Sequence, residues 1–233
     1  MLYLLIILIV RKLRSKNLDF NLMKFFKRLL LKVKYVFPFL LISMTLTTNE
    51  VNTEERIVFD IINKGKNVGY ISIEKSTSEN NTIYNVDSKV ETQLIFKFKA
   101  EGKERSIYRN DTLIYSSVYR KLNNKIKLNQ TLKFNKGNYA IIKDKNKSSL
   151  NLNVITCNLV VLFFEEPIDT DKVYCDKLKK ELNIIKLAKG KYKVKFPNGS
   201  YNIFNYKNGK ILHIDAVGTF YKVKLKKQQN RNV

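Results

Sequence analysis

Short runs rich in valine, isoleucine, tyrosine and phenylalanine follow one another along most of the chain, and turn residues separate them. In the run Lys191–Phe196, lysines alternate with Tyr192, Val194 and Phe196. Alternation with a period of two places one face of a strand against a core and the other face in water. The pattern predicts a mainly β domain: a strongly curved antiparallel sheet or an open barrel of about ten strands, with one or two short helices.

The turns between these runs have sequences that favour tight hairpins. Asn208-Gly209 is the strongest hairpin signal in the chain, and Asn123-Asn124 has related chemistry, because asparagine tolerates a positive φ. The predicted strands are Ile57–Asn63, Val68–Thr77, Thr82–Phe98 as one bent strand, Glu101–Arg109, Thr112–Leu122, Lys125–Asn135, Asn138–Asp144, Lys191–Phe196, Tyr201–Tyr206, Ile211–Val217 and Thr219–Leu225.

One segment breaks this rhythm. Cys157–Phe164 is apolar nearly throughout and is followed by Glu165, Glu166 and Pro167. It predicts a short buried helix that packs across the sheet and ends before the proline. For Asp169–Leu182, both a loop and a second helix stay open.

The N-terminal region has the pattern of a targeting segment. A basic run is followed by the apolar block Tyr35–Leu46 and then by small polar residues, which predicts a signal peptide at residues 23–47, with a hydrophobic leader helix. The block is too short for an ordinary membrane span. Residues 1–22 are interpreted as an upstream extension of the reading frame, and residues 48–233 as a single antiparallel β domain.

This leader predicts export to the periplasm or the cell envelope. An uncleaved anchor remains an alternative, as do two membrane-associated segments in tandem within the first 47 residues. No cysteine directly follows the apolar block, so a lipid anchor at the expected cleavage point is not predicted.

The chain carries a formal net charge of +24, from 44 basic and 20 acidic residues. Residues 1–47 hold nine bases and one acid, so about +16 belongs to the remainder. The lysines are dispersed, they outnumber the arginines 36 to 8, and no helix-turn-helix, zinc finger or phosphate loop is recognisable, which argues against nucleic acid as a partner. A solvated basic face is the first interpretation, and attraction to an anionic envelope surface is the second.

Few residues suggest catalysis or metal binding. The single histidine, His213, lies two positions before Asp215 on the same face of a predicted strand, but no Gly-x-Ser-x-Gly elbow accompanies it. A structural histidine is therefore expected, and a hydrolase remains a minor hypothesis. Cys157 and Cys175 form either a disulfide or two buried thiols. No metal site and no cofactor are expected.

Several turn motifs occur together, among them Gly65–Gly69, Phe164–Pro167, Phe196–Gly199 and Asn208-Gly209. Over residues 55–227 this set resembles an uncharacterised domain-of-unknown-function family of secreted flavobacterial (Bacteroidota) proteins. That family is similar in architecture to the half-barrel of periplasmic lipoprotein carriers. The resemblance implies an envelope location and an apolar ligand in the concavity of the sheet, and it implies no catalytic residues.

Most strand aromatics are expected in the core, and some are expected to line a pocket beneath the apolar Leu159–Phe164 segment. The candidate pocket residues are Leu159, Leu162, Phe163, Tyr192, Phe196, Phe204 and Tyr206. Apolar walls with few polar groups suit a lipid or another apolar ligand. The sequence thus predicts a non-enzymatic envelope protein that binds or carries an apolar or amphiphilic ligand. The alternative is an interaction module that docks on anionic envelope polymers, or on a partner protein, through its basic face; the oligomeric state stays open.

Overall fold

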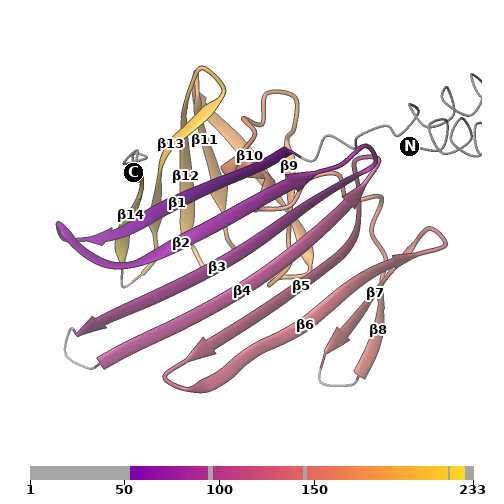
Figure 1. The fold of residues 1–233 in the computed structure, drawn as a ribbon, viewed down its shortest axis with the longest axis horizontal. Coiled ribbons are helices and arrows are strands. Elements are labelled where there is room, and N and C mark those ends of the chain that lie inside the picture. Colours follow the sequence, from indigo (N-terminus) through magenta and orange to yellow (C-terminus); the bar gives the residue numbers. More distant parts are fainter. Residues whose placement is uncertain (1–52, 94–96, 144–145, 220, 229–233) are drawn as a thin grey trace, which may run out of the picture. The chain divides into compact units, whose positions relative to one another are not determined.

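The computed structural model describes residues 53–93, 97–143, 146–219 and 221–228. These residues form one mainly β unit (Figure 1). Its strands are β1 (Thr53–Asn63), β2 (Lys66–Thr77), β3 (Asn81–Gln93), β4 (Lys97–Arg109), β5 (Thr112–Leu122), β6 (Lys125–Asn135), β7 (Asn138–Lys143), β8 (Asn146–Leu150), β9 (Lys172–Cys175), β10 (Lys180–Ala188), β11 (Lys191–Lys195), β12 (Tyr201–Lys207), β13 (Lys210–Val217) and β14 (Lys222–Lys227).

The predicted upstream extension, signal peptide and leader helix lie outside the described residues. Within the described ranges, no helix has the length and apolar character that a membrane crossing requires.

All fourteen strands belong to one antiparallel sheet, in the order β8-β7-β6-β5-β4-β3-β2-β1-β14-β13-β12-β11-β10-β9. Two meanders, β1–β8 and β9–β14, are joined where β1 pairs with β14, with Phe59 opposite Lys227. No described residue pairs β8 with β9, so the sheet is open. The mainly β antiparallel class is confirmed, whereas the predicted strong curvature is wrong, because the sheet neither closes nor curls strongly.

The predicted hairpins are present where the turn residues indicated them. Asn208 and Gly209 have φ of 52° and 75° between β12 and β13, and Asn123 and Asn124 have φ of 45° and 65° between β5 and β6. Both central residues of a type I′ turn need a positive φ, which is the conformation that these residues tolerate.

Three segments differ from the sequence prediction. Thr82–Phe98 is not one bent strand but is divided between β3 and β4. The apolar Cys157–Phe164 segment contains only a single 3-10 turn, Val161–Phe163, instead of a longer helix. The ambiguous stretch Asp169–Leu182 contains β9 and the start of β10, because pairing with neighbouring strands overrides its helix-like mixture of charges.

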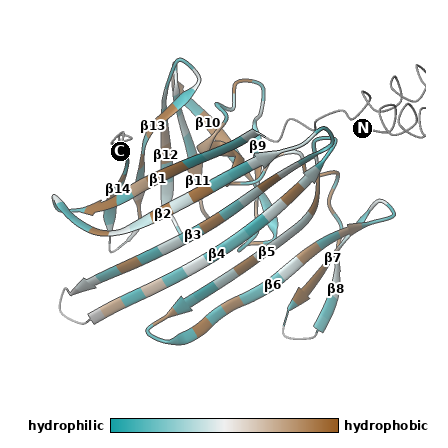
Figure 2. Cartoon of the chain, viewed as in Figure 1, coloured by the Kyte–Doolittle hydropathy of each residue, from teal (hydrophilic) through white to brown (hydrophobic). Residues whose placement is uncertain are grey.

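One face of the sheet is apolar, and alternation of apolar and polar residues along the strands produces it (Figure 2). This core face carries the fully buried Phe59, Ile73 and Ile214, and cross-strand pairs such as Ile57 with Ile73 extend it from strand to strand. We call the opposite side the outer face.

Residues 151–171, here called the crossing segment, connect β8 with β9 along the core face. Ile155 is held at both backbone groups: its N–H donates to Tyr139 Oη at 3.0 Å, and its carbonyl accepts from Leu113 N at 2.9 Å. Phe163 lies edge-on between Phe59 and Phe204, with ring centroids 5.6 and 6.2 Å apart. The segment therefore contacts strands from both meanders.

Two strands approach closely at Gly69 on β2. A Cβ there would lie 2.0 Å from the carbonyl oxygen of Lys89 on β3, which no side chain tolerates. Only glycine lets β2 and β3 pair next to the bulge at Ile61 and Ile62.

We expect Ile73→Ala to lower the free energy of unfolding by about 2–5 kcal/mol, because it removes fully buried methyl groups and leaves a cavity. The matched control is Ile126→Ala, at a strand position that is 61% exposed, where a change within about 0.5 kcal/mol is expected. Urea unfolding of both variants measures the difference. Equal losses would contradict the assignment of the core face.

Candidate functional site

An open hollow of about 440 Å³ lies on the core face, where β3 and β5 end and β4 and β6 begin. Its apolar lining comes from Val90, Ala100, Leu122 and Leu128. Four basic residues also line it: Arg120 and Lys121 on β5, Lys127 on β6, and Lys177 in the turn after β9. We call this site the core-face hollow.

Arg120 reaches into the core-face hollow because its cross-strand partner is a glycine. Arg120 lies opposite Gly102 on β4. A Cβ on Gly102 would lie 2.3 Å from Arg120 Nη1 and 2.7 Å from Ser88 Oγ. The missing side chain thus leaves room for the guanidinium above the sheet.

The guanidinium of Arg120 is half-buried and donates from Nη2 to Glu104 Oε1. Burial lowers the pKa of Arg120, whereas the charge of Asp176 opposes that shift. Because an arginine titrates so far above neutrality, the side chain stays a cation. Its charge is shared with Glu104. Lys177 is exposed and makes no ion pair within the described part of the chain, so its charge is available to a ligand.

The turn that carries Lys177 is fixed by a buried carboxylate. Asp176 accepts at Oδ1 from Ser116 Oγ and at Oδ2 from Asn158 Nδ2, at 3.2 Å for the second contact. Its backbone carbonyl accepts from Gln130 Nε2. These contacts hold the turn after β9 against β5 and β6, which places Lys177 at the hollow.

Asn158 completes this arrangement from the crossing segment. Its Nδ2 also donates to Ser106 Oγ at 2.8 Å, and its Oδ1 accepts from Tyr108 Oη at 2.9 Å. We call Ser106, Tyr108, Ser116, Gln130, Asn158 and Asp176 the polar cluster. Burial raises the pKa of Asp176, and the hydrogen bonds from Ser116 and Asn158 oppose this shift only in part.

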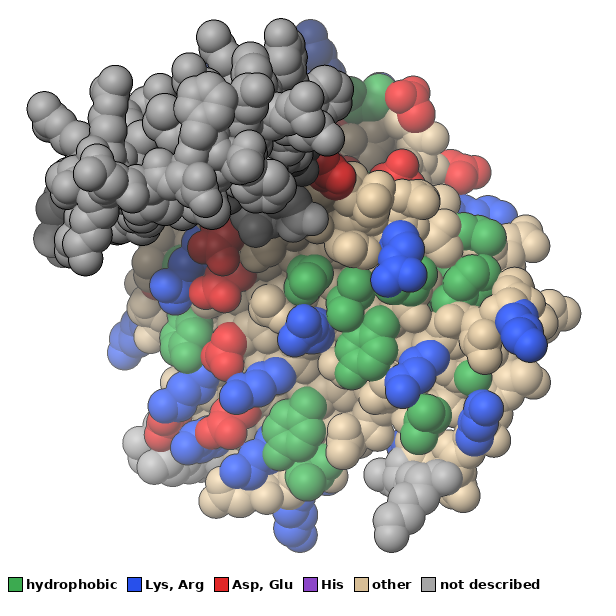
Figure 3. All heavy atoms as spheres, turned by 45° about the vertical axis from the view of Figure 1, so that its right-hand side comes forward, with side chains coloured by type: hydrophobic (Ala, Val, Ile, Leu, Met, Phe, Trp, Pro, Cys, Tyr) green, Lys and Arg blue, Asp and Glu red, His purple; other side chains and the backbone are tan. Residues whose placement is uncertain are grey.

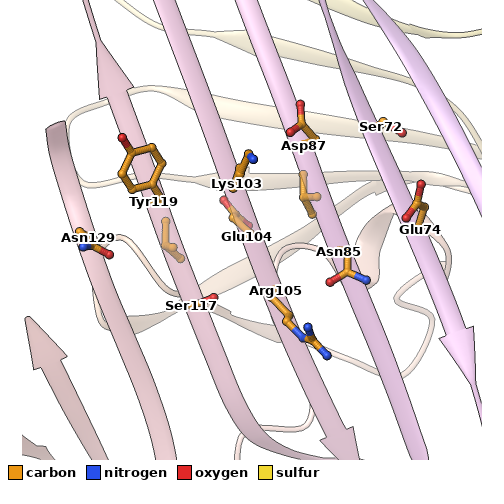
Figure 4. Close-up of a pocket in the computed structure, with 12 residues that line it drawn as sticks. Ser72, Glu74, Asn85, Asp87, Lys103, Glu104, Arg105, Ser117, Tyr119 and Asn129 are labelled. Carbon is orange, nitrogen blue, oxygen red and sulfur yellow. The ribbon is translucent and has the colours of Figure 1, made fainter. Parts of the chain in front are cut away.

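A second hollow, of about 380 Å³, lies on the outer face (Figure 4). Glu74, Asp87, Lys103 and Arg105 come from neighbouring strands around it, with Tyr119 beside them. These two acidic and two basic side chains balance in charge. On the face shown in Figure 3, acidic side chains (red) lie among basic ones (blue). Because these charges balance, the outer-face hollow shows no preference for an anionic or a cationic ligand.

The seven predicted pocket residues are brought together, but as packed core. Leu162, Tyr192, Phe204 and Tyr206 are buried, and Leu159, Phe163 and Phe196 pack against them. Tyr192 and Tyr206 lie edge to face at 5.8 Å between ring centroids, and Tyr206 Oη donates to the carbonyl of Leu162. None of the seven lines either of the two hollows described above.

His213 lies on the outer face, with Nε2 3.4 Å from Asp215 Oδ2. The neighbours of that carboxylate are Asn205 Nδ2, at 3.3 Å, and Lys224 Nζ, at 3.7 Å from Oδ1. Among the described hydrogen bonds, no hydroxyl group joins the pair, so the geometry resembles a polar strand contact.

The two adjacent glutamates serve different strands. Glu165 accepts from Lys75 Nζ at 2.8 Å and from Tyr84 Oη at 3.3 Å, on β2 and β3. Glu166 accepts from Tyr192 Oη at 2.9 Å, on β11. These contacts tie the crossing segment to both meanders.

Both cysteines are free thiols in the structure. Burial raises the pKa of Cys157 to about 12 and also raises that of Cys175. Thiols that are protonated and buried are weak nucleophiles, so neither suggests a reactive site.

Arg120 and Lys177 were not among the sequence candidates. The alternation of β5 places Arg120 on the same face as Ser116 and Val118, so an inward arginine was detectable in principle. No sequence signal predicts that Lys177 lies at the same hollow as Arg120, because the position of Lys177 depends on the polar cluster.

The chain belongs to the family described as Domain of unknown function (DUF6134), whose profile matches residues 59–228. This confirms the predicted membership of a domain-of-unknown-function family. Among solved structures, the chain is similar to the crystal structure of a beta-barrel-like protein of Domain of Unknown Function DUF1849 from Brucella abortus, with 10% sequence identity over 77% of this chain and 97% of that chain and a TM-score of 0.48. A comparison with curated proteins finds no match.

We expect Asp176→Asn to change how stability depends on pH. In the unfolded chain the carboxyl titrates near its usual pKa of about 3.9, whereas in the folded protein its pKa is raised. Between the two values the folded state binds more protons, so the contribution of Asp176 to stability falls as pH rises. The stability of Asp176→Asn relative to the wild type should therefore increase from about pH 4 upward and then level off.

Urea unfolding at a series of pH values measures this difference. Asp111→Asn is the control, because Asp111 is exposed and asparagine tolerates its φ of 58°. A relative stability of Asp176→Asn that stays flat or falls as pH rises would refute the expected titration.

Proposed function

We propose that this protein is an exported, non-enzymatic protein of the periplasm or cell envelope that binds an amphiphilic ligand in the core-face hollow. The ligand has an apolar chain and an anionic head group. One observation carries the proposal: the hollow joins an apolar wall, formed by Val90, Ala100, Leu122 and Leu128, to the cations of Arg120 and Lys177.

The size and lining of the hollow support a small ligand. Sites for such ligands usually span roughly 300–1,000 Å³ and combine apolar walls with a few polar groups. Glu101 is the one acid among the lining residues, and it pairs with Lys99 at 3.2 Å and with Lys121 at 3.8 Å. An anionic head group near Lys177 therefore meets uncompensated positive charge.

The predicted signal peptide supports the proposed location. The resemblance to secreted flavobacterial proteins, and through them to the half-barrel of lipoprotein carriers, supports a ligand at the core face. In this proposal the predicted aromatic pocket around Phe163 and Phe204 serves as packed core, and the ligand occupies the open end of the same face.

The preference for an anionic head group is testable with two compounds of equal chain length, decanoate and decanol, as competitors of the fluorescent probe anilinonaphthalene sulfonate. Lys177→Gln should weaken competition by decanoate roughly two- to fivefold and leave decanol unchanged, because an exposed charge contact contributes up to about 1 kcal/mol. Lys103→Gln on the outer face is the matched control and should change neither.

Ala100→Phe tests the position of the site, since its ring would fill the hollow and reduce binding of both compounds about tenfold or more. Thermal unfolding shows whether Ala100→Phe is folded. If Ala100→Phe does not fold, the result with Lys177→Gln alone decides the test. Absence of competition by either compound, or equal competition by both in every variant, would overturn the proposal.

A further inference from the structure

The second meander presents a face of lysines. Between Asn183 and Gln228 the chain has eleven lysines and one acidic residue, Asp215, a net charge of +10. Between Thr53 and Lys143, by contrast, it has seventeen basic and ten acidic residues, a net charge of +7 over twice the length. Positive charge is thus concentrated on β10–β14.

Strand register arranges six of these lysines in two lines. Lys191, Lys193 and Lys195 point outward from β11, opposite the buried Tyr192 and Val194. On the outer face, three cross-strand rows each begin at a lysine of β11 and end at a lysine of β14. The rows are Lys191-Asn205-His213-Lys226, Lys193-Ile203-Asp215-Lys224 and Lys195-Tyr201-Val217-Lys222.

The six lysines, here called the lysine platform, lie close together on a continuous sheet. Strands are about 4.8 Å apart, so the two lines are roughly 14 Å apart, and each line is about 13 Å long. Asp215 contacts Lys224 at 3.7 Å and is the one acid inside the rows. Asp60, which extends one row onto β1, already accepts hydrogen bonds from Asn67 and Gln228.

Apolar side chains stand exposed among these lysines. Leu212 is 47% exposed and is the extra residue of the bulge between β12 and β13. Ile185, 45% exposed, lies opposite Lys193, and Leu187 on the same strand is 47% exposed. A soluble polyanion gains little from such residues, whereas the boundary between lipid head groups and acyl chains accommodates them.

We propose that the lysine platform docks this protein on a bilayer surface that contains anionic phospholipid head groups. The lysines supply attraction to the negative surface, and Leu212 and Ile185 insert at the head-group boundary. The site is separate from the core-face hollow, so this inference does not depend on the proposed ligand.

Vesicle sedimentation tests the proposal, with phosphatidylcholine alone compared with equal parts of phosphatidylcholine and phosphatidylglycerol. The wild-type protein should bind the anionic vesicles, less so at high salt, and should bind the neutral vesicles weakly. The triple variant Lys193→Gln/Lys195→Gln/Lys224→Gln should bind anionic vesicles about tenfold to a hundredfold more weakly. The triple control Lys89→Gln/Lys103→Gln/Lys133→Gln loses the same charge from exposed positions of the first meander and should bind nearly as the wild type does.

Equal losses in the two triple variants would overturn the proposal, because net charge alone would then explain binding. So would equal binding to both kinds of vesicle. Leu212→Ser should weaken vesicle binding several-fold and leave binding to heparin, a soluble polyanion, unchanged. If Leu212→Ser affected both equally, or if the protein bound heparin but not vesicles, the lysine platform would be a site for a polymer instead. Lys177→Gln should bind vesicles nearly normally, which separates this result from a failure of the proposed ligand site.

Discussion

The hydrogen bonds that hold the crossing segment against the core face are the interaction on which the rest of the structure depends. A single sheet with one apolar face must cover that face. Here residues 151–171 cover it, but they bring backbone and side-chain polar groups into the interior, and each needs a partner. Tyr139 accepts a hydrogen bond from the backbone N–H of Ile155. The side chain of Asn158 forms hydrogen bonds with Tyr108, Ser106 and Asp176.

The same hydrogen bonds position the hollow. Burial of Asp176 is unfavourable unless its oxygens are paired, and Ser116 and Asn158 pair them. The hydrogen-bonded carboxylate fixes the turn after β9 against β5 and β6. Because Lys177 belongs to this turn, it lies at the core-face hollow. The aromatic core around Phe163 fills one part of the core face, and the space that remains is the core-face hollow.

The two meanders also divide the electrostatics of the molecule. On the outer face of the first, acids and bases from neighbouring strands lie side by side, as Glu74 and Arg56 do at 3.5 Å. On the second, the lysines of β11 and β14 have Asp215 as the one acid within their rows. One sheet thus combines a balanced surface with a strongly basic one, and its net charge says little about where attraction to anions occurs.

The sequence by itself determined the features that depend on local chemistry. Turns such as Asn208-Gly209 require residues that tolerate a positive φ, and strands such as Thr112–Leu122 require alternation, so both were predictable with nearly correct bounds. Tertiary structure decided the rest. The short β9 has too few residues for a pattern, the first four residues of β8 are polar, and the pairing of β1 with β14 joins residues far apart in the chain. Arg120, Gly102 and Lys177 meet only because the crossing segment and the polar cluster are buried together, and no local pattern encodes a contact whose stability comes from burial between distant strands.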